Sequence, residues 1–220
     1  MDDITRTLKD HYARTFEQYG ATAKGVDWND ESELLVRYDK MLAVLQKDFA
    51  SIPTPPSLLD VGCGWGGLLR RARGLGVPLR YTGIDVVEQM VAHGRAEFPD
   101  AAFECADVFA MKAPPDHDFV VCNAILTQKL AVSIPEMERF LKRLVVKMFE
   151  LCRHGVAFNV MSTRVNFMAE NLFYQNPVDL LSWLLTEVSP RVRLDHGYSS
   201  LASGRGRGKF YDFTVYVYKD

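Results

Sequence analysis

Residues 58–67 read LLDVGCGWGG, a short apolar run that ends in a cluster of glycines. The run from Leu58 to Val61 is bounded by glycine and mostly apolar, which is typical of a strand buried on both faces of a sheet. Glycines are favoured after such a strand because the chain turns sharply into a helix and its backbone approaches a ligand closely. The stretch therefore predicts a strand–turn–helix unit that holds a nucleotide-like molecule.

The glycines of this turn fit two patterns at once. Gly62, Gly64 and Gly67 satisfy G-x-G-x-x-G, the dinucleotide fingerprint. Gly62, Gly64 and Gly66 satisfy G-x-G-x-G, the turn of adenosylmethionine-binding enzymes. The turn alone leaves both cofactors open.

Carboxylates at the ends of successive predicted strands separate the two interpretations. Asp60 stands two residues before the first glycine, where its charge would repel the pyrophosphate of a dinucleotide. Asp85 ends a second strand about 20 residues after the turn, in the place of a ribose-binding carboxylate. Asp107 follows a third strand. Adenosylmethionine carries an ammonium and a sulfonium group, so this distribution of negative charge favours it.

The rest of the chain alternates apolar strand-like runs with helical patterns. Helices are expected over 66–75, 86–98 and from the Ser133/Glu136 capping box to Met148, and strands at 81–84, 102–105, 119–122 and 155–160. This alternation predicts an α/β fold with a parallel sheet covered on both faces. The last two strands, 191–196 and 210–218, are joined only by a loop, so the final strand is expected to run antiparallel.

Two further helices are expected ahead of the sheet. The first covers 5–19, and the second runs from an Asp30 cap to Leu45 and ends at the prolines of 53–56. We therefore predict an N-terminal helical cap over 1–50 and a cofactor-binding core over 51–220, together one domain. An aromatic-rich insertion at 161–177 is expected to act as a substrate lid.

Four segments together carry a resemblance to a known family: LLDVGCGWG at 58–66, GID at 83–85, ADV at 106–108 and YDFTVYVY at 211–218. They resemble class I S-adenosylmethionine-dependent methyltransferases over roughly residues 57–220. The resemblance implies a Rossmann-like three-layer sandwich with a seven-stranded, mostly parallel sheet of order 3-2-1-4-5-7-6 and an antiparallel last strand. It also implies adenosylmethionine as the cofactor.

The resemblance further implies roles for single residues. Asp60 and the glycine backbone would hold the methionine portion, Asp85 the ribose and Asp107 the adenine. The full predicted cofactor set is Asp60, Gly62, Cys63, Gly64, Asp85, Val86, Met90, Asp107, Val108, Asn123 and Arg37. Structural roles fit several of the same positions: Asp85 as a helix cap, Asp107 as a turn residue and Met90 in the core.

Fewer residues define the acceptor side. His196 ends the predicted sixth strand on the binding side of the sheet, and it is the candidate catalytic base, with a structural histidine as the alternative. The segment GRGRGK at 204–209 suits a carboxylate or phosphate on the acceptor, or forms only a solvated turn. We therefore expect a small and, from this segment, anionic acceptor. The alternatives are an NAD(P)-dependent oxidoreductase and a nucleic-acid or protein methyltransferase.

Composition restricts the setting of this activity. The 220 residues are 48% hydrophobic and 25% charged with a net charge of −2, which argues against a protein that coats nucleic acid. The N-terminus lacks the apolar run of a signal peptide, so a cytoplasmic location without membrane contact is expected. None of the four cysteines forms a C-x-x-C pair, so they are expected to be reduced core residues with no metal site. A small-molecule substrate is the expected partner, and a homodimer is left open.

Overall fold

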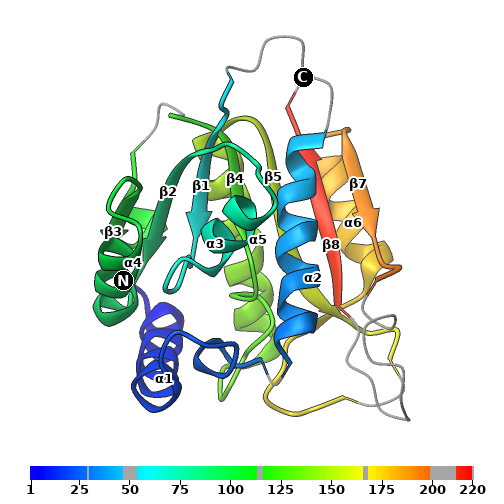
Figure 1. Cartoon of the computed structure of the whole chain (residues 1–220). Coiled ribbons are helices and arrows are strands. Elements are labelled where there is room, and N and C mark those ends of the chain that lie inside the picture. The colour runs from blue at the N-terminus through cyan, green and yellow to red at the C-terminus, as the bar shows by residue number, and fades with distance from the viewer. Residues whose placement is uncertain (29, 47–53, 113–115, 166–167, 199–211, 220) are drawn as a thin grey trace.

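The computed structural model describes residues 1–28, 30–46, 54–112, 116–165, 168–198 and 212–219, in which a central sheet carries helices on both faces (Figure 1). The strands are β1 (Ser57–Val61), β2 (Arg80–Asp85), β3 (Ala102–Cys105), β4 (His117–Cys122), β5 (Cys152–Ser162), β6 (Tyr174–Gln175), β7 (Val192–Asp195) and β8 (Asp212–Tyr218). The α-helices are α1 (Asp3–Tyr19), α2 (Glu31–Leu42), α3 (Gly67–Gly74), α4 (Glu88–Glu97), α5 (Ile134–Leu151) and α6 (Pro177–Glu187). Short 3-10 turns are η1 (Lys24–Val26), η2 (Ala43–Gln46) and η3 (Val108–Ala110).

The strands pair in the order β3-β2-β1-β4-β5-β8-β7, and the short β6 pairs with β5 outside that path. The pairs among β1 to β5 are parallel, whereas β8 is antiparallel to both β5 and β7. This confirms the predicted order 3-2-1-4-5-7-6 and the reversed last strand, with β7 and β8 as the predicted sixth and seventh strands. The two residues of β6 are an addition that no pattern in the sequence indicated.

Helices α2, α3 and α4 cover one face of the sheet, and α5 and α6 cover the other (Figure 1). Along β1 the side chains alternate between these layers, so that Leu58 packs in the cluster with α2 and α3 while Leu59 and Val61 pack in the cluster with α5. Every residue of β1 is buried, as expected for a strand covered on both faces.

Most helices and strands begin and end close to the residues predicted from the sequence, and a few differ. The capping box of Ser133 and Glu136 starts α5, but the helix continues to Leu151. Helix α6 was not expected, although Asn176 caps it and Pro177 occupies its first turn. The expectation of four core cysteines is wrong for Cys105, which is exposed, while the other three are buried.

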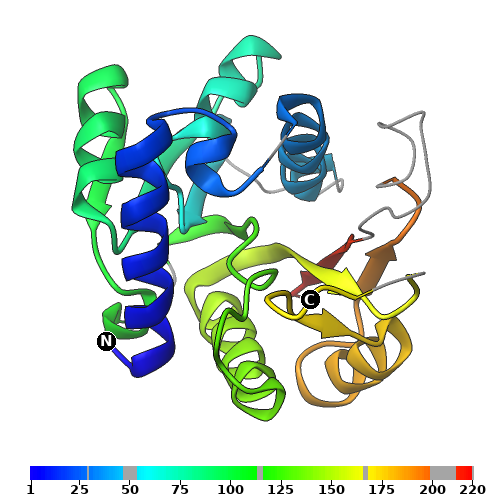
Figure 2. The same cartoon turned by 90° about the horizontal axis from the view of Figure 1, so that it is seen from below.

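Helix α1 lies at the edge of the sheet where β1 and β2 end (Figure 1). In the view from below, this helix lies in front of that edge (Figure 2). Asp2 caps it by accepting the backbone N–H of Thr5 at 2.9 Å, and Leu8 joins the core cluster beside α5. No helix in the described part of the chain is long and apolar enough to cross a membrane. The cationic segment 204–209 lies outside the described residues.

Candidate functional site

The backbone of the glycine turn selects between its two sequence patterns. Gly62, Gly64 and Gly66 have φ values of 72°, 54° and 94°, in the left-handed region where a side chain is strained. Gly67 instead opens α3 without a positive φ. The conformation thus uses the spacing G-x-G-x-G, and Gly67 serves helix packing, because an added Cβ would meet the hydroxyl of Tyr38.

Asp85 fastens the turn to the end of β2. Its Oδ2 accepts the backbone N–H of Gly64 and its Oδ1 accepts that of Val87, both at 2.9 Å. Burial raises the pKa of this carboxyl, and the backbone N–H groups oppose that rise. Asp85 therefore braces the turn and also holds Val87, the residue that precedes α4.

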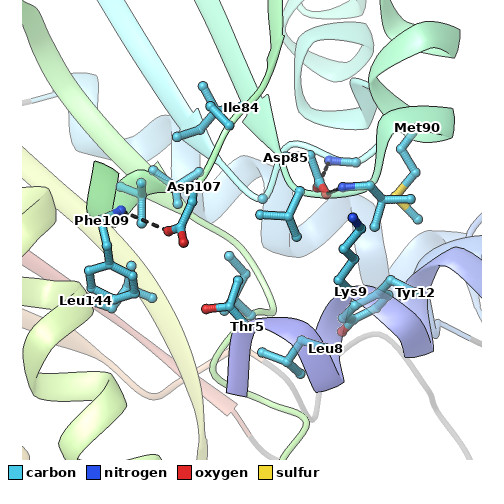
Figure 3. Close-up of a pocket in the computed structure, with 18 of the residues that line it drawn as sticks. Thr5, Leu8, Lys9, Tyr12, Ile84, Asp85, Met90, Asp107, Phe109 and Leu144 are labelled. Carbon is cyan, nitrogen blue, oxygen red and sulfur yellow. Dashed lines mark hydrogen bonds between the residues drawn. The ribbon is translucent and has the colours of Figure 1, made fainter. Parts of the chain in front are cut away.

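A pocket opens where β1, β2 and β3 end, and α1 closes it from the opposite side (Figure 3). We call it the main pocket. Its walls are mostly apolar, and α1 contributes Thr5, Leu8, Lys9 and Tyr12. The predicted cofactor residues that line it are Gly62, Gly64, Asp85, Val86, Met90, Asp107 and Val108. An N-terminal helical cap is predicted from the sequence, but none of these α1 side chains is among the predicted ligands.

Asp60 and Cys63 stand behind the turn, outside the lining of the main pocket. Asp60 is 2% exposed and accepts the hydroxyl of Tyr81 at 2.7 Å. Burial disfavours its charged form and raises its pKa to about 7, although the Tyr81 hydroxyl opposes the rise. The Cys63 side chain is buried against Gly83, where an added Cβ would contact its sulfur at 2.8 Å.

Two predicted cofactor residues, Asp107 and Asn123, differ in whether their side-chain oxygens form hydrogen bonds within the described part of the chain. Asp107 accepts the N–H of Phe109 at 3.0 Å and so caps η3, the turn role that its position allowed. The Oδ1 of Asn123, directly after β4, is buried and has no partner among the described residues. The hydroxyl of Thr5, in the wall of the main pocket, is in the same state.

Arg37 and His196 lie apart from the main pocket. The Arg37 guanidinium binds Asp212 through two hydrogen bonds of 2.9 and 2.6 Å and stacks on the Trp28 ring, 4.0 Å from its centroid. This pairing gives Arg37 a partner other than the expected cofactor carboxylate. The Nε2 of His196 lies 2.7 Å from the Oγ of Ser162, so its placement matches the structural alternative.

A second pocket lies beside the main pocket and shares Val26 with it. The segment after β4 runs between the two, since Ile125 lines the main pocket and Ala124 and Thr127 line the second. Other residues that line the second pocket are Asp27, Trp28, Glu33, Arg37, Gln128, Met161 and Asn171. Part of the predicted insertion 161–177 therefore does border a pocket.

The residues of the main pocket fit adenosylmethionine. The apolar walls suit the adenine ring, and two carboxylates accept from hydroxyl or amino groups. Thr5 adds a buried hydroxyl that makes no hydrogen bond with the described residues, as expected for a group that a ligand satisfies. Among the described residues no group of three or more His, Cys, Asp or Glu side chains is arranged to hold a metal ion.

Comparisons with known proteins agree with this geometry. The model of a methyltransferase domain matches residues 58–145. A Mycobacterium tuberculosis protein that is named as a methyltransferase is 28% identical over 170 residues, covering 75% of this chain and 94% of that protein. The trans-aconitate 2-methyltransferase of Variovorax paradoxus is 32% identical over 124 residues, which are 54% of this chain and 45% of that enzyme.

Solved structures show the same fold. Phosphoethanolamine N-methyltransferase 2 of Haemonchus contortus, in complex with S-adenosylmethionine, superposes with a TM-score of 0.63 at 12% identity, covering 94% of this chain and 60% of that one. The plantazolicin methyltransferase BpumL, in complex with S-adenosylhomocysteine, has a TM-score of 0.57 at 14% identity and covers 98% of both chains.

Strand order, glycine turn and matches together define the class of this enzyme. The chain is a class I S-adenosylmethionine-dependent methyltransferase with a Rossmann-like fold. Adenosylmethionine is the cofactor of that class, so the dinucleotide interpretation of the glycines is set aside.

Proposed function

We propose that the enzyme methylates a small, anionic molecule, with adenosylmethionine in the main pocket and the acceptor in the second. The observation that carries this placement is that Asp85 and Asp107, at neighbouring strand ends, line one apolar pocket beneath α1 (Figure 3). The bound cofactor supplies an electrophilic methyl group on a sulfonium. The chain supplies position, charge and exclusion of water.

We assign the nucleoside of the cofactor to the two carboxylates. Each oxygen of Asp85 already accepts one backbone N–H, and a carboxylate oxygen has a second acceptor position that suits a ribose hydroxyl. Asp107 accepts the N–H of Phe109 through Oδ1, and its Oδ2 lies 3.5 Å from the N-terminal ammonium of Met1. Each oxygen retains a second acceptor position that suits the adenine amino group. Val86, Met90 and Val108 add apolar contacts around the ring.

We assign the methionine end to the turn and the segment after β4. The backbone of Gly62 and Gly64 borders the pocket, and Cys63 takes part through its main chain only, because its side chain packs on Gly83. Asp60 lies behind the turn, where a ligand cation favours the charged carboxylate. Asn123 lines neither pocket, but its neighbour Ala124 lines the second, and its Oδ1 has no partner among the described residues, so we place that oxygen near the donor methyl group.

The acceptor is assigned to the second pocket because that pocket lies across the post-β4 segment from the first. Its Trp28 and Met161 provide apolar contact, and Gln128 and Asn171 provide hydrogen-bonding groups. An acceptor held there approaches the cofactor from the side of Ala124. Such in-line positioning is the main requirement of a methyl displacement.

Two observations support an anionic acceptor: the names of two relatives and a cationic segment of the sequence. Two of the relatives that align with about half of the chain are trans-aconitate 2-methyltransferases, and trans-aconitate is a polycarboxylate. The segment 204–209 carries three cations. A carboxylate acceptor needs no general base because its oxygen already lacks a proton, so His196 has no catalytic task in this proposal.

One observation favours a different acceptor class. The described wall of the second pocket carries the carboxylates of Asp27 and Glu33, and its only cation there, Arg37, is paired with Asp212. A wall of this charge suits an amine. An amine acceptor is therefore the second candidate.

Transfer of labelled methyl groups to a panel of polycarboxylates and amines tests the proposal. We expect products from the carboxylates, and a strong rise in KM when Arg205 and Arg207 are both replaced by Ala. Replacement of Glu33 by Gln removes a negative charge from the wall of the second pocket and should therefore not raise that KM. Methylation of amines alone, with KM raised by Glu33→Gln, would refute the anionic assignment and favour the second candidate.

A further inference from the structure

The proposed cofactor pocket has a wall that comes from outside the glycine turn and the strand ends. Helix α1 lays Thr5, Leu8, Lys9 and Tyr12 along it. Figure 3 shows Thr5 near the centre of the view, on the α1 side of the pocket between Asp107 and Leu8. Thr5 thus lies across the pocket from Asp85 at the end of β2 and from Asp107 just after β3.

Thr5 is a polar residue in an apolar place. It is 8% exposed, and its buried hydroxyl makes no hydrogen bond of ordinary geometry in the described part of the chain, although the Asp2 carboxylate lies close enough for this hydroxyl to favour its charged form. Other threonines of α1 satisfy their hydroxyls within the helix: Thr7 donates to the backbone oxygen of Asp3 at 2.9 Å, and Thr15 to that of His11 at 2.8 Å. Burying a hydroxyl without a partner lowers stability, so its presence requires a reason.

A ligand in the main pocket provides that reason. We infer that Thr5 is a cofactor-binding residue whose hydroxyl forms a hydrogen bond with the nucleoside portion of the cofactor. The inference rests on the proposed placement of adenosylmethionine. A nucleoside offers hydroxyls, ring nitrogens and an amino group, and a threonine hydroxyl pairs with any of these as donor or acceptor. The position opposite Asp107 selects the nucleoside over the methionine end.

This role has a consequence that a purely structural threonine would not share. Without ligand the hydroxyl makes no hydrogen bond with the residues that the structure describes, whereas in the complex it is paired. Valine has nearly the same shape and is also β-branched, so Thr5→Val removes the hydroxyl with little other change. The substitution should therefore stabilise the free protein and weaken the complex.

Two measurements on the full chain test these opposite effects. Thermal unfolding without ligand measures stability, and calorimetric titration with S-adenosylhomocysteine measures affinity. We expect Thr5→Val to raise Tm and to weaken binding by about five-fold. Thr5→Ser retains the hydroxyl and should keep the affinity within about two-fold of the wild type. Thr7→Val makes the same chemical change on the same helix, outside the pocket, and should leave the affinity unchanged.

5′-Methylthioadenosine, which lacks the amino-acid portion, serves as the nucleoside probe and should lose the same factor with Thr5→Val. A wild type that binds adenosylhomocysteine and a Thr5→Val variant that binds it equally well would overturn the inference while leaving the proposed function intact. Weaker binding of adenosylhomocysteine alone would place the contact at the amino-acid end and also overturn it. A wild type that binds neither ligand would contradict the proposed function itself.

Discussion

Arg37 and Asp212, separated by 175 positions in sequence, form a doubly hydrogen-bonded ion pair whose side chains are 3% and 0% exposed. The carboxylate of Asp212 also accepts the side-chain N–H of Asn159 at 2.9 Å, and the Oδ1 of Asn159 accepts the backbone N–H of Ala124 at 2.8 Å. The pair therefore ties α2 to β8 and, through Asn159, to the segment that separates the two pockets.

Breaking this pair should destabilise the protein strongly. Asp212→Asn leaves the Arg37 charge buried beside a neutral amide, and the free energy of unfolding should fall by about 3–5 kcal/mol in urea denaturation. Asp100→Asn removes one member of the exposed Arg73–Asp100 pair and should have little effect. Equal losses in the two variants would show that burial of the first pair is energetically unimportant.

Asp60 should make stability depend on pH. Its folded pKa of about 7 lies above the ordinary 3.8, so the folded protein binds more protons than the unfolded chain between those values. The contribution of Asp60 to stability is therefore present at pH 4 and lost as the pH rises through 7. Asp60→Asn should remove this slope, so that the variant gains about 2–4 kcal/mol relative to wild type between pH 4 and pH 8. Parallel pH profiles of the two proteins would contradict the raised pKa.

Asp85 should be needed for cofactor affinity. Asp85→Asn places an amide N–H₂ against one of the backbone donors of Gly64 and Val87, which loosens the turn and removes charge-assisted hydrogen bonds to the ligand. Binding of S-adenosylhomocysteine should weaken about ten-fold or more in calorimetry. Asp179→Asn, on the exposed side of α6, is the matched control and should bind as wild type does. If Asp85→Asn also kept full affinity, Asp85 would only brace the turn.

Gly67 should prove to be a packing residue. A Cβ there would meet the hydroxyl of Tyr38, so Gly67→Ala should lower the free energy of unfolding by about 1–3 kcal/mol. Adding Tyr38→Phe removes the nearest atom and should restore part of that loss in a double-mutant cycle. Gly74→Ala, which meets no atom within 4 Å, is the control for helix propensity. Strictly additive losses from Gly67→Ala and Tyr38→Phe would exclude this contact as the cause.

The sheet order could be predicted because it depends on local signals and on connection rules. The short apolar run of β1, the capping box of Ser133 and the loop between the last two strands each act within a few residues. Helix α6 was missed although Asn176 and Pro177 are start signals, because the aromatic segment before them was interpreted as an insertion. Local signals of this kind identify an element only where its neighbours are assigned correctly.

The candidate site could be predicted only in part. Asp85 and Asp107 were placed at one edge because parallel strands of a sheet end together. Which side chains line a pocket depends on partners far away in sequence, as in the pairing of Asp60 with Tyr81 and of Arg37 with Asp212. The contribution of Thr5 required the position of α1, which no pattern around the glycine turn encodes.

Calorimetric titration of the wild-type chain with S-adenosylhomocysteine, and in parallel with NADH, tests the central assignment of the main pocket most directly. We predict saturable binding of adenosylhomocysteine in the micromolar range and no measurable heat with NADH. Tight binding of NADH without binding of adenosylhomocysteine would contradict the account.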